Sequence, residues 1–200
     1  LDLIVADGGA NTVSVFLTRD SGALFLRTDY RTGSGAVAVS VGDLDGDGDL
    51  DIVSGNSTKR TISVLFNDST GTFSLPVDFF VGAAASAVAL ADLDSDGDLD
   101  VAVGDSEQGD LRIYLNDGRG SFEAPAVYGV APDLSGLLTA DLTGNGLPDL
   151  VALSRSQGTI SVLANQGNAL LEVRDPLTVG TGTFGVTSGD FDLEDRKSVV

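Results

Sequence analysis

The sequence contains no cysteine and no histidine, and its 11 Lys and Arg residues are far outnumbered by 30 Asp and Glu residues. Without cysteine, thiol and disulfide chemistry are excluded. Without histidine, the most frequent general acid or base is missing, and we expect that the chain is not an enzyme. The net charge of -19 argues against a nucleic-acid partner, because phosphate binding needs clustered Lys and Arg. No apolar run approaches the roughly 20 residues of a membrane-spanning helix, so no membrane span is expected.

Many of the acidic residues lie in nine-residue segments that begin every 49 residues. Residues 43–51 read D-L-D-G-D-G-D-L-D and residues 92–100 read D-L-D-S-D-G-D-L-D. Residues 141–149 are a weaker copy, D-L-T-G-N-G-L-P-D, and residues 190–198 are a degenerate one. The first three segments hold 12 Asp residues (five, five and two), which would repel one another unless a cation neutralised them. A fixed period of this length is typical of repeat proteins.

Residues outside the acidic segments follow the same 49-residue period, with apolar residues, glycines and asparagines in matching columns. Each repeat predicts four short strands, as at 37–41, 51–54, 62–66 and 77–81, because apolar and polar residues alternate and Asn, Asp, Gly and Pro lie between the strands. The fold class predicted is therefore all-β, a β-propeller built of four-stranded antiparallel blades.

Residues 1–200 are expected to form a single repeat array of about four blades. The chain begins at Leu1 within a repeat, so we expect that the natural N-terminus and any signal peptide are missing. Two interpretations stay open. The favoured one is a fragment of a larger propeller, and the other is a four-bladed ring closed by its own termini.

The acidic segments have the composition of calcium loops, because calcium takes six to eight oxygen ligands in a flexible geometry. Positions 1, 3, 5 and 9 of each loop offer side-chain oxygens, position 7 offers a backbone carbonyl, and a glycine at position 6 permits the sharp turn. The predicted ligands are Asp43, Asp45, Asp47, Asp49 and Asp51; Asp92, Asp94, Asp96, Asp98 and Asp100; and, in a weaker third site, Asp141, Thr143, Asn145 and Asp149. An EF-hand is excluded, since its position-12 Glu is replaced by Ser54 or Val103.

The first two acidic loops follow the pattern D-x-[DN]-x-[DN]-G-x-x-D and precede an apolar strand, and a turn runs from Asn116 to Phe122. This combination resembles the FG-GAP repeat, also described as the VCBS-type repeat. This repeat is the blade unit of integrin α-subunit propellers and of many bacterial surface and secreted proteins. The resemblance covers essentially the whole chain. It implies calcium in the loop between the first and second strands of each blade, and it adds the carbonyl of Leu147 to the third site. Asp195 and Ser198 depart from the pattern, so the fourth site is the weakest. Family propellers commonly have seven blades, which favours the fragment.

In integrins the metal loops lie opposite the ligand face, so the resemblance implies that a partner would contact the loops near 55–60, 104–110, 153–158, 31–35, 82–85 and 131–135. These loops differ between repeats, and the partner, protein or glycan, stays unknown.

We expect a calcium-binding extracellular module, secreted or on the cell surface, for adhesion or protein recognition, with calcium in a structural role. The alternative is a carbohydrate-binding, lectin-like propeller. A scaffold domain of a secreted polysaccharide-active enzyme is a third possibility.

Overall fold

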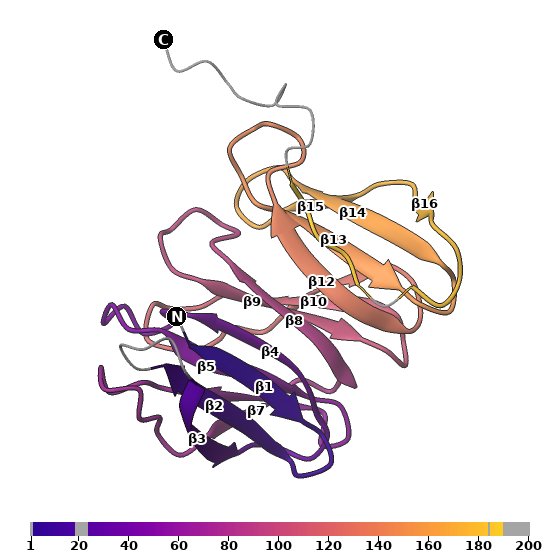
Figure 1. Cartoon of the computed structure of the whole chain (residues 1–200). Helices are drawn as coiled ribbons and strands as arrows, with labels where there is room; N and C mark the ends of the chain where they lie inside the picture. The colour runs from indigo at the N-terminus through magenta and orange to yellow at the C-terminus, as the bar shows by residue number, and fades with distance from the viewer. Residues whose placement is uncertain (1, 19–23, 184, 190–200) are drawn as a thin grey trace.

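The computed structural model describes residues 2–18, 24–183 and 185–189, which form sixteen β-strands and no helix (Figure 1). The first sheet contains β1 (Leu3–Asp7), β2 (Thr12–Thr18) and β3 (Leu24–Arg31). The second contains β4 (Ala36–Gly42), β5 (Asp51–Asn56), β6 (Thr61–Leu65) and β7 (Val77–Phe80). The third contains β8 (Ala85–Ala91), β9 (Asp100–Asp105), β10 (Asp110–Tyr114) and β11 (Ala126–Gly129). The fourth contains β12 (Leu134–Ala140), β13 (Asp149–Ser154), β14 (Thr159–Asn165), β15 (Leu171–Val173) and β16 (Leu177–Thr178), the last paired with β14. The predicted all-β fold of repeated four-stranded antiparallel blades is confirmed.

The hydrogen-bond register repeats with the sequence. Ile52 lies opposite Leu65 in the second sheet, and residues 49 positions later, Val101 and Tyr114, are opposite each other in the third. The first strands β4, β8 and β12 each carry a register shift at their beginning, at equivalent positions. The first sheet differs from the others, because β1 corresponds to β5 in the repeat and the described residues contain no strand there that corresponds to β4. It is therefore a three-stranded sheet with β1 at its edge.

Three apolar cores lie between consecutive sheets, because each middle sheet is apolar on both faces. In β5, for example, Ile52 packs against the first sheet and Val53 packs against the third, as the two-residue period of a strand requires. Both side chains are fully buried. Full burial of such a side chain contributes about 1.5–3 kcal/mol, so packing between sheets is a main source of stability.

The four sheets follow one another in chain order as an arc, with the first and last sheets at opposite ends (Figure 1). The first strands β4, β8 and β12 are successive neighbours in this arc. Aromatic residues close the cores at their rims, and the rings of Phe79 and Phe122 meet edge to face at 5.0 Å. The described part of the chain contains no helix that is long and apolar enough to cross a membrane.

Candidate metal sites

The acidic loops connect the first strand of a sheet to the second, joining β4 to β5, β8 to β9 and β12 to β13. The first carboxylate of each loop shapes it by accepting backbone hydrogen bonds. Asp43 accepts from the amides of Gly46 and Gly48, both at 2.9 Å. The glycine at position 6 has a positive φ in all three loops, 93° at Gly48, 102° at Gly97 and 87° at Gly146, as expected for the turn.

The closing carboxylate of each loop is completely buried and joins three segments of its own sheet. Asp100 accepts one hydrogen bond from the amide of Leu93 (2.9 Å) and another from the amide of Asn116 (3.0 Å). Asp51 and Asp149 make the corresponding pairs of bonds. This carboxylate therefore fixes the loop to the turn after the third strand.

Two groups of carboxylates converge in the first two loops. Oxygens of Asp43, Asp45 and Asp51 lie within 4.8 Å of one another, and so do oxygens of Asp92, Asp94 and Asp100. Two ligands of one calcium ion, each about 2.3–2.6 Å from it, are at most about 5 Å apart, so each group has the spacing of a single site.

One atom in the first group is unexplained by the protein alone. Oδ1 of Asp45 is buried and has no hydrogen-bond partner among the described residues. A buried carboxylate oxygen without a partner is costly, whereas a cation would satisfy it. The donor set consists only of hard oxygens, and on this observation the residues present fit calcium.

The electrostatics of the two groups agree with this fit. Burial, followed by the charge of Asp47, raises the pKa of the Asp45 carboxyl. Burial likewise raises the pKa of Asp94 and of Asp51, and it raises the pKa of Asp100 from 3.8 to about 6. The carboxylates are thus held in a place that disfavours their negative charge, which a bound cation would reverse.

The third loop has the same backbone shape with fewer charges. Asp141 accepts from the amides of Asn145 and Gly146, and Asp149 accepts from the amides of Leu142 and Thr143. The side-chain amide of Asn145 is already engaged, since its Oδ1 accepts from Leu147 and its Nδ2 donates to the carbonyl of Asn165. Only two carboxylates are available here.

The other predicted ligands lie around the two groups but outside them. Asp47 and Asp96 each accept a hydrogen bond from an amide two residues later, at 2.9 Å and 3.0 Å. The side chain of Asp49 accepts a hydrogen bond from the hydroxyl of Ser69. Its backbone carbonyl oxygen is the atom predicted to bind the metal. The fourth loop, predicted at residues 190–198, lies outside the described residues.

The acidic loops also connect neighbouring sheets, which the sequence analysis did not predict. The side chain of Leu44 is buried in the core between the second and third sheets, and its carbonyl accepts hydrogen bonds from the side-chain amide of Asn116 (2.8 Å) and the backbone amide of Gly120 (3.0 Å). Leu93 makes the same contacts to Asn165 and Ala169 in the fourth sheet. Each of these two loops thus connects its own sheet to the next one through a buried leucine side chain and hydrogen bonds to the leucine carbonyl. The column of asparagines was visible in the sequence, but it was interpreted only as part of a turn.

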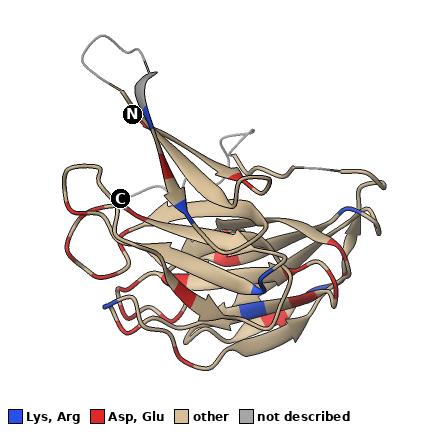
Figure 2. Ribbon diagram, turned by 90° about the horizontal axis from the view of Figure 1, so that it is seen from below, with Lys and Arg blue, Asp and Glu red and all other residues tan. Residues whose placement is uncertain are grey.

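The loops predicted to face a partner, between the second and third strands, lie at the opposite ends of those strands from the acidic loops. They carry ion pairs of their own. Arg60 pairs with Glu107 of the third sheet, and Arg155 pairs with Asp133 at 3.2 Å. Figure 2 shows Asp and Glu in many loops, whereas Lys and Arg occupy scattered positions in the part of the chain that is described.

The model of the FG-GAP-like repeat family matches the sequence three times, at residues 1–54, 43–103 and 92–152. The ends of the three overlapping matches advance by 49 residues, which is the period of the acidic loops. Comparison with curated protein sequences gives no match.

Several solved structures share the fold. A protein from Bacteroides uniformis, provisionally named a 6-phosphogluconolactonase, is 14% identical, with a TM-score of 0.68 over 90% of this chain and 54% of that one. A lectin from Agrocybe aegerita that recognises non-reducing terminal N-acetylglucosamine is 22% identical, with a TM-score of 0.56 over 86% of this chain and 51% of the lectin. A Bacteroides caccae protein of unknown function is 11% identical, with a TM-score of 0.56 over 90% of this chain and 58% of that one. This chain therefore spans little more than half of each, and at these identities the likeness shows the fold alone.

Proposed function

The chain belongs to the FG-GAP-like repeat family, and we propose on that basis that it is a calcium-binding β-propeller module of an extracellular protein that serves adhesion or protein recognition. The observation that carries the proposal is the pair of converging carboxylate groups, together with the buried Oδ1 of Asp45, which has no hydrogen-bond partner among the described residues. In this proposal the ligands come from the predicted sets, led by Asp43, Asp45 and Asp51 in the first loop.

The proposed role of calcium is structural. Each site includes a closing carboxylate that already bonds to the turn after the third strand, so a cation there would hold three segments of one blade together. Loops of this kind in extracellular modules bind calcium with dissociation constants of about 10⁻⁴–10⁻³ M. Sites of that affinity would fill outside cells and stay empty in a calcium-poor cytosol, which supports an exported protein, secreted or on the cell surface.

A calorimetric calcium titration tests the sites directly. We expect at least two sites in the unchanged chain, and the loss of one site in each of the variants Asp45→Asn and Asp94→Asn. Asp175→Asn is the matched control, since it makes the same charge change at an exposed residue far from the loops in sequence. Full binding by both loop variants, or no binding by the unchanged chain, would overturn the assignment.

Glycan recognition is the second candidate. It is supported by the lectin of the same fold, although the likeness extends to fold only. A glycan array that includes glycans ending in N-acetylglucosamine separates the two roles, because a lectin would bind a defined subset and an adhesion module for proteins would bind none. The proposal assigns no catalytic activity, and a screen on acidic polysaccharides would detect the enzyme-scaffold alternative.

A further inference from the structure

The turn after β10, residues 116–120, contacts both of the first two acidic loops. On the side of the first loop, Nδ2 of Asn116 donates to the carbonyl of Leu44 at 2.8 Å. On the side of the second loop, the backbone amide of Asn116 donates to Oδ1 of Asp100 at 3.0 Å, and its Nδ2 also donates to the carbonyl of Leu99 at 3.1 Å. One asparagine is therefore bonded to both loops at once.

The backbone of this turn packs closely against the same two loops. A Cβ atom added at Gly118 would lie 2.4 Å from a carboxylate oxygen of Asp98 in the second loop. A Cβ atom added at Gly46 in the first loop would lie 3.6 Å from the carbonyl oxygen of Gly118. Asn116 is only 5% exposed, so the loss of either of its bonds would leave a buried polar group without a partner, which is costly.

Each end of this connection belongs to a candidate metal site. Asp100 is a member of the second carboxylate group, and its Oδ1 accepts from Asn116. Leu44 is the chain neighbour of Asp45 in the first group, and its amide donates to Oδ2 of Asp51, another member of that group, at 3.0 Å. The two carboxylate groups are thus linked through Asn116 and through the carbonyl and amide of Leu44.

A cation at either site would act on this connection. Calcium holds its ligand oxygens at about 2.3–2.6 Å, so a cation in the second loop would fix Asp100 and, through it, Asn116. The carbonyl of Leu44 would then already be held in place when the first loop binds its own cation, and less ordering would remain to be done. Charge acts in the opposite direction, because a cation in one loop reduces the negative potential at the other, and salt weakens this effect.

We propose that Asn116 is a positioning residue that couples the first two metal sites, so that calcium in either loop raises the affinity of the other loop for calcium. This coupling rests on the proposed function, because both loops must bind calcium. The route runs from Asp100 through Asn116 and Leu44 to the first carboxylate group. Calcium then fills the two loops over a narrower range of concentration than it would fill two independent sites.

A calcium titration of the whole chain followed by NMR tests the coupling. The amide resonances of Gly48 and Gly97 report the two loops separately, because each amide donates to the first carboxylate of its own loop. Asp94→Asn disables the second loop and should raise the calcium concentration at the midpoint for Gly48 by about fivefold, at the lower end of ordinary coupling between sites. Coupling is reciprocal, so Asp45→Asn should also raise the midpoint for Gly97.

Substitution of Asn116 separates the hydrogen-bonded connection from the effect of charge. In the Asn116→Ala chain, Asp94→Asn should change the midpoint for Gly48 by less than about twofold, because the change of charge is the same and the bond to Leu44 is absent. Asn116→Asp is a second variant for the same measurement. Its carboxylate can accept from the amide of Gly120, as the asparagine does, but it has no hydrogen to donate to Leu44.

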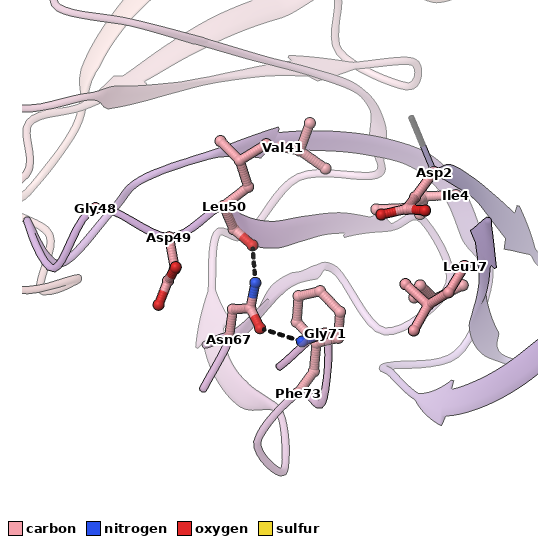
Figure 3. A pocket seen from close by; sticks show the side chains of 11 residues that line it. Asp2, Ile4, Leu17, Val41, Gly48, Asp49, Leu50, Asn67, Gly71 and Phe73 are labelled. Atoms are coloured by element: carbon pink, nitrogen blue, oxygen red, sulfur yellow. Dashed lines mark hydrogen bonds between the residues drawn. The ribbon is translucent and has the colours of Figure 1, made fainter. Parts of the chain in front are cut away.

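The matched control is Asn67→Ala, which removes the same side chain at the equivalent position of the second sheet. Nδ2 of Asn67 donates to the carbonyl of Leu50 and its Oδ1 accepts from the amide of Gly71, both at 3.2 Å and both within its own repeat (Figure 3). In the Asn67→Ala chain, the full effect of Asp94→Asn on the midpoint for Gly48 should therefore remain.

The possible outcomes separate the coupling from the proposed function. The titrations are made below the unfolding temperature of each calcium-free variant, so that global unfolding does not link the sites. If neither glycine amide responds to calcium in the unchanged chain, the proposed function and the coupling are both wrong. If both respond, but each loop variant leaves the midpoint of the other loop unchanged or lowers it, the metal sites stand and the coupling is wrong. Equal effects of Asp94→Asn in the Asn116→Ala and Asn67→Ala chains would exclude Asn116 as the coupling residue.

Discussion

Single carboxylates within one acidic loop have different tasks. The first and last, such as Asp92 and Asp100, accept backbone hydrogen bonds that shape the loop and tie it to its sheet. Asp45, by contrast, has a buried oxygen with no hydrogen-bond partner in the described part of the chain, and burial raises its pKa. We therefore expect substitutions of the two kinds to behave differently, even though the same residue type is removed.

Asp45→Asn should change stability in opposite directions with and without calcium. Without calcium, removal of one of several crowded charges should raise the free energy of unfolding by on the order of 0.5 kcal/mol, or about 1–2 °C in Tm. With calcium, the variant should lose the stabilisation from one site. Thermal unfolding in both buffers measures this, with Asp175→Asn as the control. A decrease in Tm in both buffers would show that Asp45 has a structural role instead.

The raised carboxyl pKa values predict a pH dependence of the calcium-free protein. The pKa of Asp100 is 3.8 when unperturbed and about 6 in the folded chain, so between these values the folded state binds more protons than the unfolded state. The free energy of unfolding should therefore fall as the pH rises from about 4 to about 6. In excess calcium the ligands must be deprotonated, so the stabilisation by calcium should increase over the same range. Urea unfolding at a series of pH values, with and without calcium, measures both slopes. A calcium-free stability that rises over this range would contradict the assignment.

At the scale of the elements, the first two acidic loops are each both a candidate metal site and a connection between neighbouring sheets. Leu44 and Leu93 bring the loop into the next core, and asparagines of the following sheet hold their carbonyls. Leu142 occupies the same position of the third loop but is 49% exposed. Among the described residues, the leucine at this loop position is thus buried between sheets in two loops and exposed in the third.

Leu93→Ala should destabilise the chain by about 2–5 kcal/mol, because the cavity it leaves lies in the core between the third and fourth sheets. Leu142→Ala is the matched change at an exposed position and should stay within about 0.5 kcal/mol of the unchanged chain. Denaturant unfolding at fixed calcium compares the two. Equal losses would show that the loop leucines contribute independently of their burial between sheets.

Much of this architecture could be predicted from the sequence, because the strand pattern and the turn residues repeat at one interval. The prediction of four strands per repeat and of the loop glycines rests on local chemistry, and the observed strand bounds differ by about one residue, as at β6 and β7. The contact between the acidic loop and the next sheet could not be predicted, since Leu44 and Asn116 are 72 residues apart and belong to different repeats. The complete burial of the closing carboxylates Asp51, Asp100 and Asp149 likewise depends on packing between segments.

At the scale of the whole molecule, the chain carries a net charge of -19. Its sheets form an array in which each sheet buries its apolar side chains against its neighbours. Repulsion among the loops opposes this packing, and neutralisation of the loops by a divalent cation would favour it. We therefore expect calcium binding and the stability of the array to be coupled.

Thermal unfolding across a calcium titration tests that coupling most directly. For two sites with dissociation constants of about 10⁻⁴–10⁻³ M, calcium at about 10 mM should add about 3–5 kcal/mol, or about 6–20 °C in Tm for a domain of this size. The doubly substituted variant Asp45→Asn, Asp94→Asn should lose most of this rise. We expect the Tm to increase with calcium and to saturate near millimolar concentration, and a Tm that does not change with calcium would contradict the coupling.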